Sequence, residues 1–165
     1  CSTVSLDLTA ESFARLAVDA ASLCTVYYFA TPRIYRKKAR LLVPLLFGEF
    51  VKFYIERFEE LGDWLDSAAH GRKIKVFLPS TVFIGDRPRG LTEYAMAKAA
   101  AEVLAADLNR TLQDVRVVCS RLPRMSTDQT ASILSVETEA VLDVMLPVVR
   151  KMEGQTVGVA GQITP

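Results

Sequence analysis

A tyrosine and a lysine four residues apart, Tyr94 and Lys98, form the pair in this sequence best suited to acid–base chemistry. Residues at positions i and i+4 of a helix share one face. Residues 92–109 are rich in alanine and free of glycine and proline, which favours a helix. A tyrosine hydroxyl can donate a proton, but its ordinary pKa of about 10 is high for exchange near neutral pH. An ammonium one turn away would lower that pKa, so the pair predicts Tyr94 as a general acid assisted by Lys98.

Two hydroxyl side chains precede this helix. Ser80 and Thr81 lie 14 and 13 residues before Tyr94, just after the apolar segment 74–78. A hydroxyl there can hydrogen-bond a carbonyl oxygen on which negative charge develops during reduction. The same two residues would also suit an ordinary loop or helix cap. In that alternative, Tyr94 is a half-buried helix residue and Lys98 is solvated.

Strands and helices alternate along the chain. Short segments rich in apolar and β-branched residues, of which 25–30 carries no charge, alternate with segments of helical periodicity, which predicts parallel strands in an α/β fold. In such sheets, ligands bind at the carboxyl ends of the strands, where Ser80 and Thr81 lie. The expected strands cover residues 4–8, 25–30, 74–78, 115–119 and 155–160, and the expected helices cover residues 10–21, 48–68, 92–109 and 138–152.

Composition and charge exclude several classes of protein. The chain has 165 residues, of which half are hydrophobic and 24% are charged, and this balance predicts one globular domain over residues 1–165. Twenty basic and nineteen acidic residues leave a net charge of +1, which argues against a basic nucleic-acid-binding protein. The apolar run 41–47 is too short to span a membrane and is broken by Pro44, so no membrane association is expected.

The cysteines and the single histidine offer little chemistry. Cys1, Cys24 and Cys119 are scattered and odd in number, so neither a disulfide framework nor a cysteine zinc site is expected, and no metal is assigned. This usage fits a reducing, cytoplasmic compartment. His70 lies in a segment that reads as a solvated loop, which argues against catalysis that depends on histidine.

The Tyr94-x-x-x-Lys98 motif, together with the preceding hydroxyl at a strand end, resembles the short-chain dehydrogenase/reductase family from Asp7 to about Gly161. The resemblance implies a Rossmann-like parallel sheet flanked by helices. The first strands would be missing, so that the chain forms the C-terminal two-thirds of the domain. It implies reduction or oxidation of a small carbonyl or alcohol substrate with NAD or NADP. Tyr94 would be the proton donor, Lys98 would also hold the nicotinamide ribose, and Thr81 or Ser80 would orient the substrate.

Further positions resemble the cofactor site of that family. Asp7-Leu8-Thr9 is similar to a family segment beside the adenine, and Tyr54 lies near the place of a catalytic asparagine. No glycine-rich phosphate loop is present in these residues. The cofactor-binding residues implied by the resemblance are Asp7, Leu8, Ala30, Thr31, Lys98, Pro123 and Thr127.

The basic run 33–40 contains five Lys or Arg in eight residues. It predicts either a solvated surface or a phosphate-binding lid for a substrate carried on coenzyme A or a carrier protein. Small apolar residues in the helix 92–109 permit close packing, and the resemblance implies pairing there into a homo-oligomer. The chain could also be part of a larger one. Two other functions stay open at this point: a sugar-nucleotide epimerase or dehydratase of the same superfamily, and a structural or docking domain without catalysis.

Overall fold

The computed structural model describes residues 6–9, 11–16, 18–19, 22–34, 42–125 and 139–154. The chain divides into two compact units, Cys1–Leu122 and Pro123–Pro165. The prediction of one domain over the whole chain stays a prediction.

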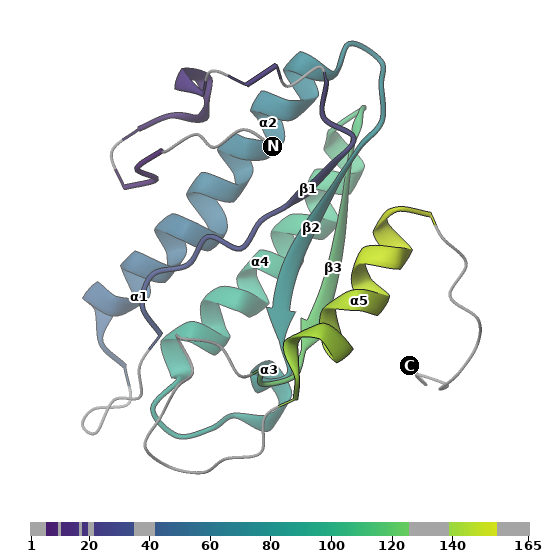
Figure 1. The fold of residues 1–165 in the computed structure, drawn as a ribbon. Helices are drawn as coiled ribbons and strands as arrows, with labels where there is room; N and C mark the ends of the chain where they lie inside the picture. The colour runs from purple at the N-terminus through teal and green to yellow at the C-terminus, as the bar shows by residue number, and fades with distance from the viewer. Residues whose placement is uncertain are drawn as a thin grey trace. The chain divides into compact units, whose positions relative to one another are not determined.

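The first unit contains a sheet of three parallel strands in the order β1-β2-β3 (Figure 1). The strands are β1 (Thr25–Tyr27), β2 (Ile74–Thr81) and β3 (Val115–Leu122). The central strand β2 pairs with both neighbours, and its middle residues are buried and apolar, as expected of an inner parallel strand. The predicted parallel α/β fold is thus confirmed. Both β2 and β3 run three residues further than expected, so Ser80 and Thr81 are the last residues of a strand.

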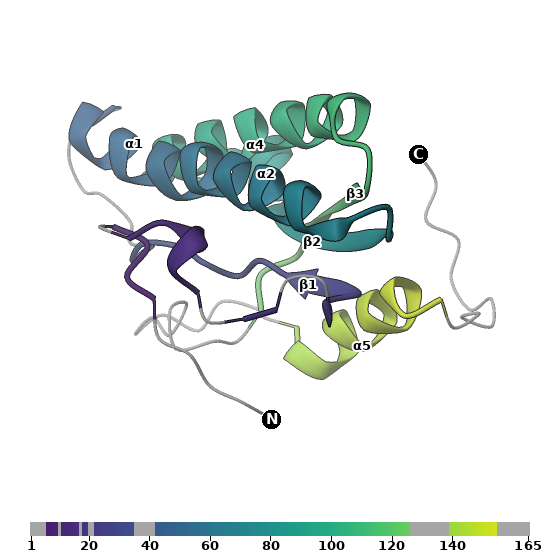
Figure 2. The ribbon, with the colours of Figure 1, turned by 90° about the horizontal axis from the view of Figure 1, so that it is seen from above.

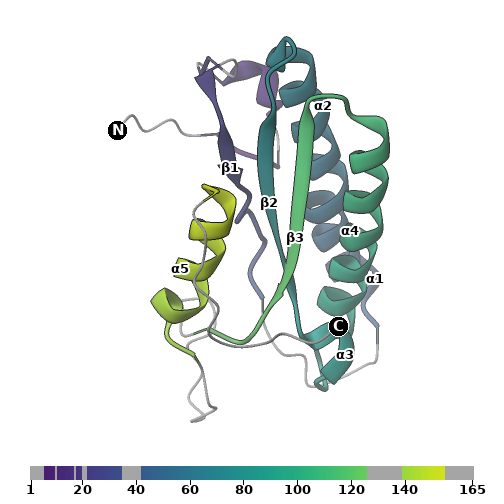
Figure 3. The ribbon, with the colours of Figure 1, turned by 90° about the vertical axis from the view of Figure 1, so that its right-hand side faces the viewer.

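Helices cover one face of this sheet (Figure 3). α1 (Pro44–Val51), a π-helical turn labelled η3 (Lys52–Glu56) and α2 (Arg57–Ala69) follow one another without a break, and α4 (Thr92–Thr111) lies beside them (Figure 2). The short α3 (Phe83–Asp86) joins β2 to α4. The core between helices and sheet consists of apolar side chains from both layers, among them Phe50, Phe58, Leu65, Ile74, Val76, Leu78, Ala97, Ala101 and Val117.

The π-helical turn interrupts a segment for which the sequence predicts one regular helix. The Tyr28 hydroxyl, from the residue after β1, donates a hydrogen bond to the carbonyl oxygen of Phe53 at 2.7 Å. A side chain that bonds to a helical carbonyl can disturb the regular ladder of hydrogen bonds. Turns of this kind are rare and occur often at functional sites.

Asp66, in the last turns of α2, fixes the start of β3. Its carboxylate accepts hydrogen bonds from the backbone amides of Gln113, Asp114 and Val115, at 3.3, 2.6 and 3.1 Å respectively. α2 then ends at His70, an exposed residue in the left-handed conformation. The placement of His70 in a turn agrees with the sequence analysis.

The helix expected over residues 10–21 is wrong. In the described part of that range, only the single 3-10 turn η1 (Phe13–Arg15) is helical. Phe13 is buried and stacks on Trp64 with ring centroids 6.3 Å apart, and its amide donates to the Glu60 carboxylate. These contacts with α2 hold the segment in an irregular form despite its helix-favouring composition.

The second unit contains α5 (Val141–Met152), with Pro147 inside it. A parallel bridge joins Met125 to Glu139 before the helix begins. The helix expected over residues 138–152 is therefore present from Val141. The expected strand 155–160 lies outside the described residues. Of the first expected strand, residues 4 and 5 also lie outside them, and residues 6–8 do not form a strand. No helix in the described ranges combines the length and apolar character needed to cross a membrane.

Candidate functional site

The structure brings Thr81, Tyr94 and Lys98 together at the carboxyl end of β2. Thr81 is the last residue of β2, and Tyr94 and Lys98 lie in the first two turns of α4. The Thr81 hydroxyl lies close enough to the Tyr94 hydroxyl to favour the ionised form of the tyrosine and so to oppose the rise of its pKa. Thr81 Oγ1 also accepts a hydrogen bond from the amide of Phe83 at 3.2 Å, which fixes this side chain at the turn into α3.

Burial raises the pKa of Tyr94, and the nearby Thr81 hydroxyl only partly opposes this effect. The ammonium of Lys98 lies 6.0 Å from the centre of the Tyr94 ring. The expected lowering of the pKa of Tyr94 by Lys98 stays a prediction, since desolvation of the phenolate dominates in this structure. The Tyr94 hydroxyl is protonated at neutral pH, which is the form needed for a proton donor.

Lys98 is buried rather than solvated, with 5% of its surface exposed. Its Nζ donates to the carbonyl oxygen of Pro79 at 2.6 Å and lies 3.9 Å from the centre of the Tyr54 ring. Desolvation lowers the pKa of Lys98 to about 8, while the nearby thiolate form of Cys119 acts in the opposite direction. A buried ammonium at the end of a parallel strand is a candidate functional group.

Tyr54, on the π-helical turn, completes this group of side chains. It is 1% exposed and stacks on Phe50, with ring centroids 5.8 Å apart. Its ring also meets that of Tyr94 edge-on, at 6.1 Å. The Tyr54 hydroxyl shares a short hydrogen bond with Thr31 Oγ1, which follows β1. We call Thr31, Tyr54, Thr81, Tyr94 and Lys98 the tyrosine–lysine cluster.

From the sequence, Tyr54 is expected only to lie near the place of the family's catalytic asparagine. Its spacing of four from Phe50 favoured an ordinary core residue, and its contact with Lys98 depends on residues far apart in the sequence. Ala30 is half-buried and packs against the core. Of the two residues predicted after β1, only Thr31 thus joins the cluster.

Ser80 and Thr81 have different partners. The Ser80 hydroxyl donates to Glu102 Oε1 at 2.6 Å. Arg121 binds the same carboxylate with two hydrogen bonds of 2.8 Å each. The carboxylate of Glu102 therefore engages Ser80, whereas the hydroxyl of Thr81 accepts the Phe83 amide and lies near Tyr94.

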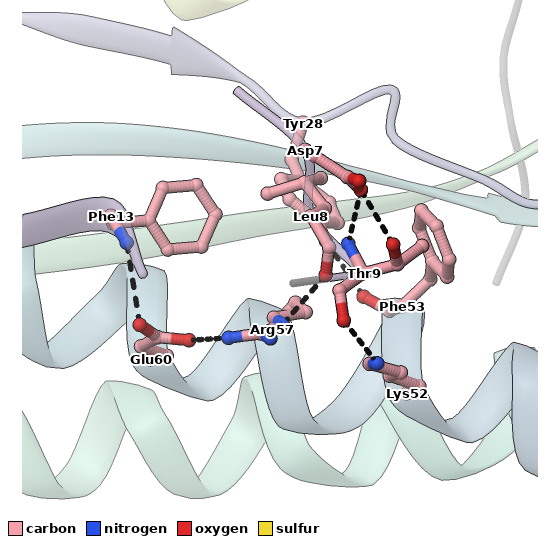
Figure 4. Close-up of polar contacts among 9 residues, drawn as sticks. All are labelled: Asp7, Leu8, Thr9, Phe13, Tyr28, Lys52, Phe53, Arg57 and Glu60. Carbon is pink, nitrogen blue, oxygen red and sulfur yellow. Dashed lines mark hydrogen bonds and ion pairs between the residues drawn. The ribbon is translucent and has the colours of Figure 1, made fainter. Parts of the chain in front are cut away.

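Asp7, Leu8 and Thr9 dock on the helix that carries Tyr54 (Figure 4). Asp7 Oδ1 accepts hydrogen bonds from the Thr9 amide and hydroxyl, at 2.8 and 2.6 Å, and these bonds lower the pKa of Asp7. The carbonyl oxygen of Leu8 accepts from Arg57 at 2.8 Å, and that of Thr9 accepts from Lys52 at 2.5 Å. These contacts hold the first described residues against η3 and α2.

The remaining residues predicted from the sequence lie in the second unit or outside the described residues. Pro123 begins the second unit, and Thr127 lies outside the described residues. Residues 35–40, which include Arg36, Lys37 and Lys38 of the basic run, also lie outside them.

Two solved structures share the fold of this chain. One is a short chain dehydrogenase from Burkholderia cenocepacia J2315 in complex with NADP, with a TM-score of 0.68 and 14% identity over 83% of this chain. The other is a 3-ketoacyl-(acyl-carrier-protein) reductase from Brucella melitensis complexed with NADH, with a TM-score of 0.52 and 17% identity over 64% of this chain. The chain spans 58% and 46% of their respective lengths. No family model and no curated protein matches the sequence.

Proposed function

We propose that this chain, which has the fold of the short-chain dehydrogenases, carries the proton-transfer machinery of an NAD(P)-dependent oxidoreductase acting on a carbonyl or alcohol substrate. The observation that carries the proposal is the tyrosine–lysine cluster itself. A protonated Tyr94, a strand-end hydroxyl that influences its pKa and a buried ammonium one turn away meet at the end of β2. The two proteins that share the fold and hold NADP or NADH support it.

Tyr94 would act as the general acid. Its hydroxyl is protonated at neutral pH, as that of an ordinary tyrosine is, and burial raises its pKa further. It would donate this proton to the carbonyl oxygen as negative charge develops there. Thr81 would orient the Tyr94 hydroxyl and hydrogen-bond the same oxygen. Thr81, rather than Ser80, is our choice for this role because Ser80 already donates to Glu102.

The donors at this end of the sheet fit a nicotinamide nucleotide. Lys98 donates a hydrogen bond to the Pro79 carbonyl oxygen, and because an ammonium carries three donor hydrogens it can also reach ribose hydroxyls. The reduced nicotinamide, when bound, supplies the hydride. Lys98 would also stabilise the tyrosinate left after proton transfer, by its positive charge.

The other cofactor contacts are proposals of the same kind. Positions after β1 would line the nicotinamide, and those before η1 would line the adenine. A glycine-rich phosphate cradle would have to come from outside these residues, which contain no such motif. The proposed contacts are Asp7, Leu8, Ala30, Thr31, Pro123 and Thr127.

The substrate and partners belong to the proposal as well. We propose a small carbonyl compound, either free or linked to coenzyme A or a carrier protein through the basic run 33–40. We also propose a homo-oligomer formed through the outer face of α4, where Met96 is 39% and Val103 is 64% exposed. Ala97, Ala101 and Ala105 pack in the core of their own chain, so they would not contribute to such an interface.

The decisive experiment uses the protein that contains this chain. Binding of NADH and NADPH is measured by fluorescence, and turnover is measured on a panel of carbonyl compounds. Tyr94→Phe should reduce turnover at least about 100-fold and leave cofactor binding unchanged, because it removes one acid group. Tyr27→Phe, in β1, serves as the matched control. Undiminished turnover in Tyr94→Phe would reject the proton donor, and failure to bind either nucleotide would favour the docking domain.

A further inference from the structure

We propose that the electron-rich face of the Tyr54 ring attracts the Lys98 ammonium and holds it in position, so that Tyr54 is a positioning residue of the tyrosine–lysine cluster. The inference deepens the proposed function and rests on it for its catalytic meaning. The contact itself stands on the geometry around Lys98.

An aromatic ring and a backbone carbonyl oxygen surround the Lys98 ammonium. Lys98 Nζ lies 3.9 Å from the centre of the Tyr54 ring, well within the range of about 6 Å in which a cation is attracted to an aromatic face. It also donates to the Pro79 carbonyl oxygen at 2.6 Å. Within the described ranges, no ion pair joins Lys98 to a carboxylate. The ring and one carbonyl therefore take the place of an acidic partner.

Contacts with the segment after β1 and with Phe50 hold the Tyr54 ring in place. Tyr54 lies in the π-helical turn η3, and its hydroxyl is bonded to Thr31. The preceding carbonyl, that of Phe53, is bonded by the Tyr28 hydroxyl at 2.7 Å. The end of β1 thus fixes both the backbone of the turn and the far end of the ring. Phe50 stacks on Tyr54, with an angle of 10° between the rings, and limits its rotation.

The groups around Lys98 affect the stability of its charged form. The groups that face Lys98 from the elements around it are Tyr54 from η3, Tyr94 from α4, the Pro79 carbonyl from β2 and Cys119 from β3. Desolvation opposes the charged form of this lysine, and an attractive ring face offsets part of that cost. Weakening the ring's negative face should therefore lower the pKa of Lys98.

The test varies the ring's charge distribution while keeping its shape. Position 54 is made Phe, then 4-fluorophenylalanine, then 3,4,5-trifluorophenylalanine. The pKa of Lys98 is followed by the ¹³Cε shift of labelled lysine, with the resonance assigned from Lys98→Arg. We expect the pKa to fall stepwise with fluorination, by about half to one unit in total. A buried lysine that is positioned by packing alone would keep one pKa through the series.

Two controls sharpen this test. Trifluorophenylalanine in place of Phe58, a buried ring of α2, should leave the pKa of Lys98 unchanged. Tyr54→Leu removes the ring and should lower the pKa at least as far as trifluorination, and circular dichroism reports whether this variant is folded. A pKa that does not change with fluorination, or that falls equally in the Phe58 control, would overturn the inference.

The outcome is separable from that of the proposed function, because the titration needs neither cofactor nor substrate. If the pKa follows fluorination while Tyr94→Phe keeps full turnover, the ring contact stands and the proposed function fails. If the reductase activity stands, the same series should move the alkaline limb of its pH–rate profile together with the pKa of Lys98. A limb that stays fixed while the pKa moves would overturn the catalytic part of the inference.

Discussion

The Tyr28 hydroxyl donates a 2.7 Å hydrogen bond to the carbonyl oxygen of Phe53, and so joins the end of β1 to the π-helical turn that carries Tyr54. The phenol is 5% exposed, and burial raises its pKa far above the ordinary value, so it stays a donor over the whole working range of pH. A contact between two core residues thus sets the geometry of a candidate site.

Tyr28→Phe should destabilise the fold by about 1 kcal/mol, because the Phe53 carbonyl loses its buried partner. Equilibrium unfolding in urea measures this change. Phe29→Leu, which changes an exposed ring next to Tyr28, is the control and should change stability less. Equal losses in the two variants would contradict the role of the Tyr28 hydroxyl.

Thr81→Val and Ser80→Ala should differ in their effect on turnover. Thr81→Val removes the hydroxyl beside Tyr94 and also the acceptor of the Phe83 amide, so it should lower turnover about 10- to 100-fold and cost about 1 kcal/mol of stability. Ser80→Ala removes a hydrogen bond to Glu102 and should cost about 1 kcal/mol of stability, with little loss of turnover. Steady-state kinetics and urea unfolding of both variants check this, and reversed results would exchange the two roles.

Lys98 should make stability rise with pH. Its folded-state pKa is lowered to about 8 from an ordinary value of 10.5, so between these values the unfolded chain binds more protons than the folded one. The cost of burying the charge is complete below pH 8 and disappears as the pH rises toward 10.5. The free energy of unfolding of the natural chain, minus that of Lys98→Met, should rise by on the order of 1–3 kcal/mol from pH 7.5 to 10.

The subtraction removes the contributions of the other groups that titrate in this range. Burial raises the pKa of Cys119 to about 11, which acts against the expected rise in both proteins. A difference that is flat across the range, or that falls, would contradict the buried and depressed state of Lys98. Urea unfolding at several pH values provides the measurement.

Asp66→Ala should destabilise the first unit by about 1–3 kcal/mol. Three backbone amides at the start of β3 lose their acceptor, and such charge-assisted bonds are stronger than neutral ones. Asp63→Ala, an exposed carboxylate of the same helix, is the matched control and should change stability by less than about 0.5 kcal/mol. Hydrogen exchange of the Asp114 and Val115 amides should accelerate in the first variant alone.

Much of the fold follows from local sequence patterns. The largely apolar segment 74–78 predicts a strand and the alanine-rich segment 92–109 predicts a helix, and both lie close to the observed β2 and α4 because period and composition agree there. The helix expected over residues 10–21 fails for a nonlocal reason. The Glu60 side chain of α2 accepts the amide of Phe13 in this segment, the Phe13 ring stacks on Trp64, and such contacts override intrinsic propensity.

The candidate site was predictable only in part. The spacing of Thr81, Tyr94 and Lys98 placed them at one end of the sheet, and the structure brings them together. The burial of Lys98 could not be inferred, since a lysine within an alanine-rich helix is usually solvated. It depends on Pro79 and Tyr54, which lie 19 and 44 residues away in the sequence. The π-helical turn was equally inaccessible, because it involves the distant Tyr28.

The residues just after β1 are mechanically coupled to the π-helical turn that carries Tyr54. Since Tyr28 holds the backbone at Phe53 and Thr31 holds the hydroxyl of Tyr54, any displacement of that short segment must be transmitted to the aromatic ring beneath the lysine. Substitutions or ligands that shift the segment would therefore retune the basicity of a side chain they never touch.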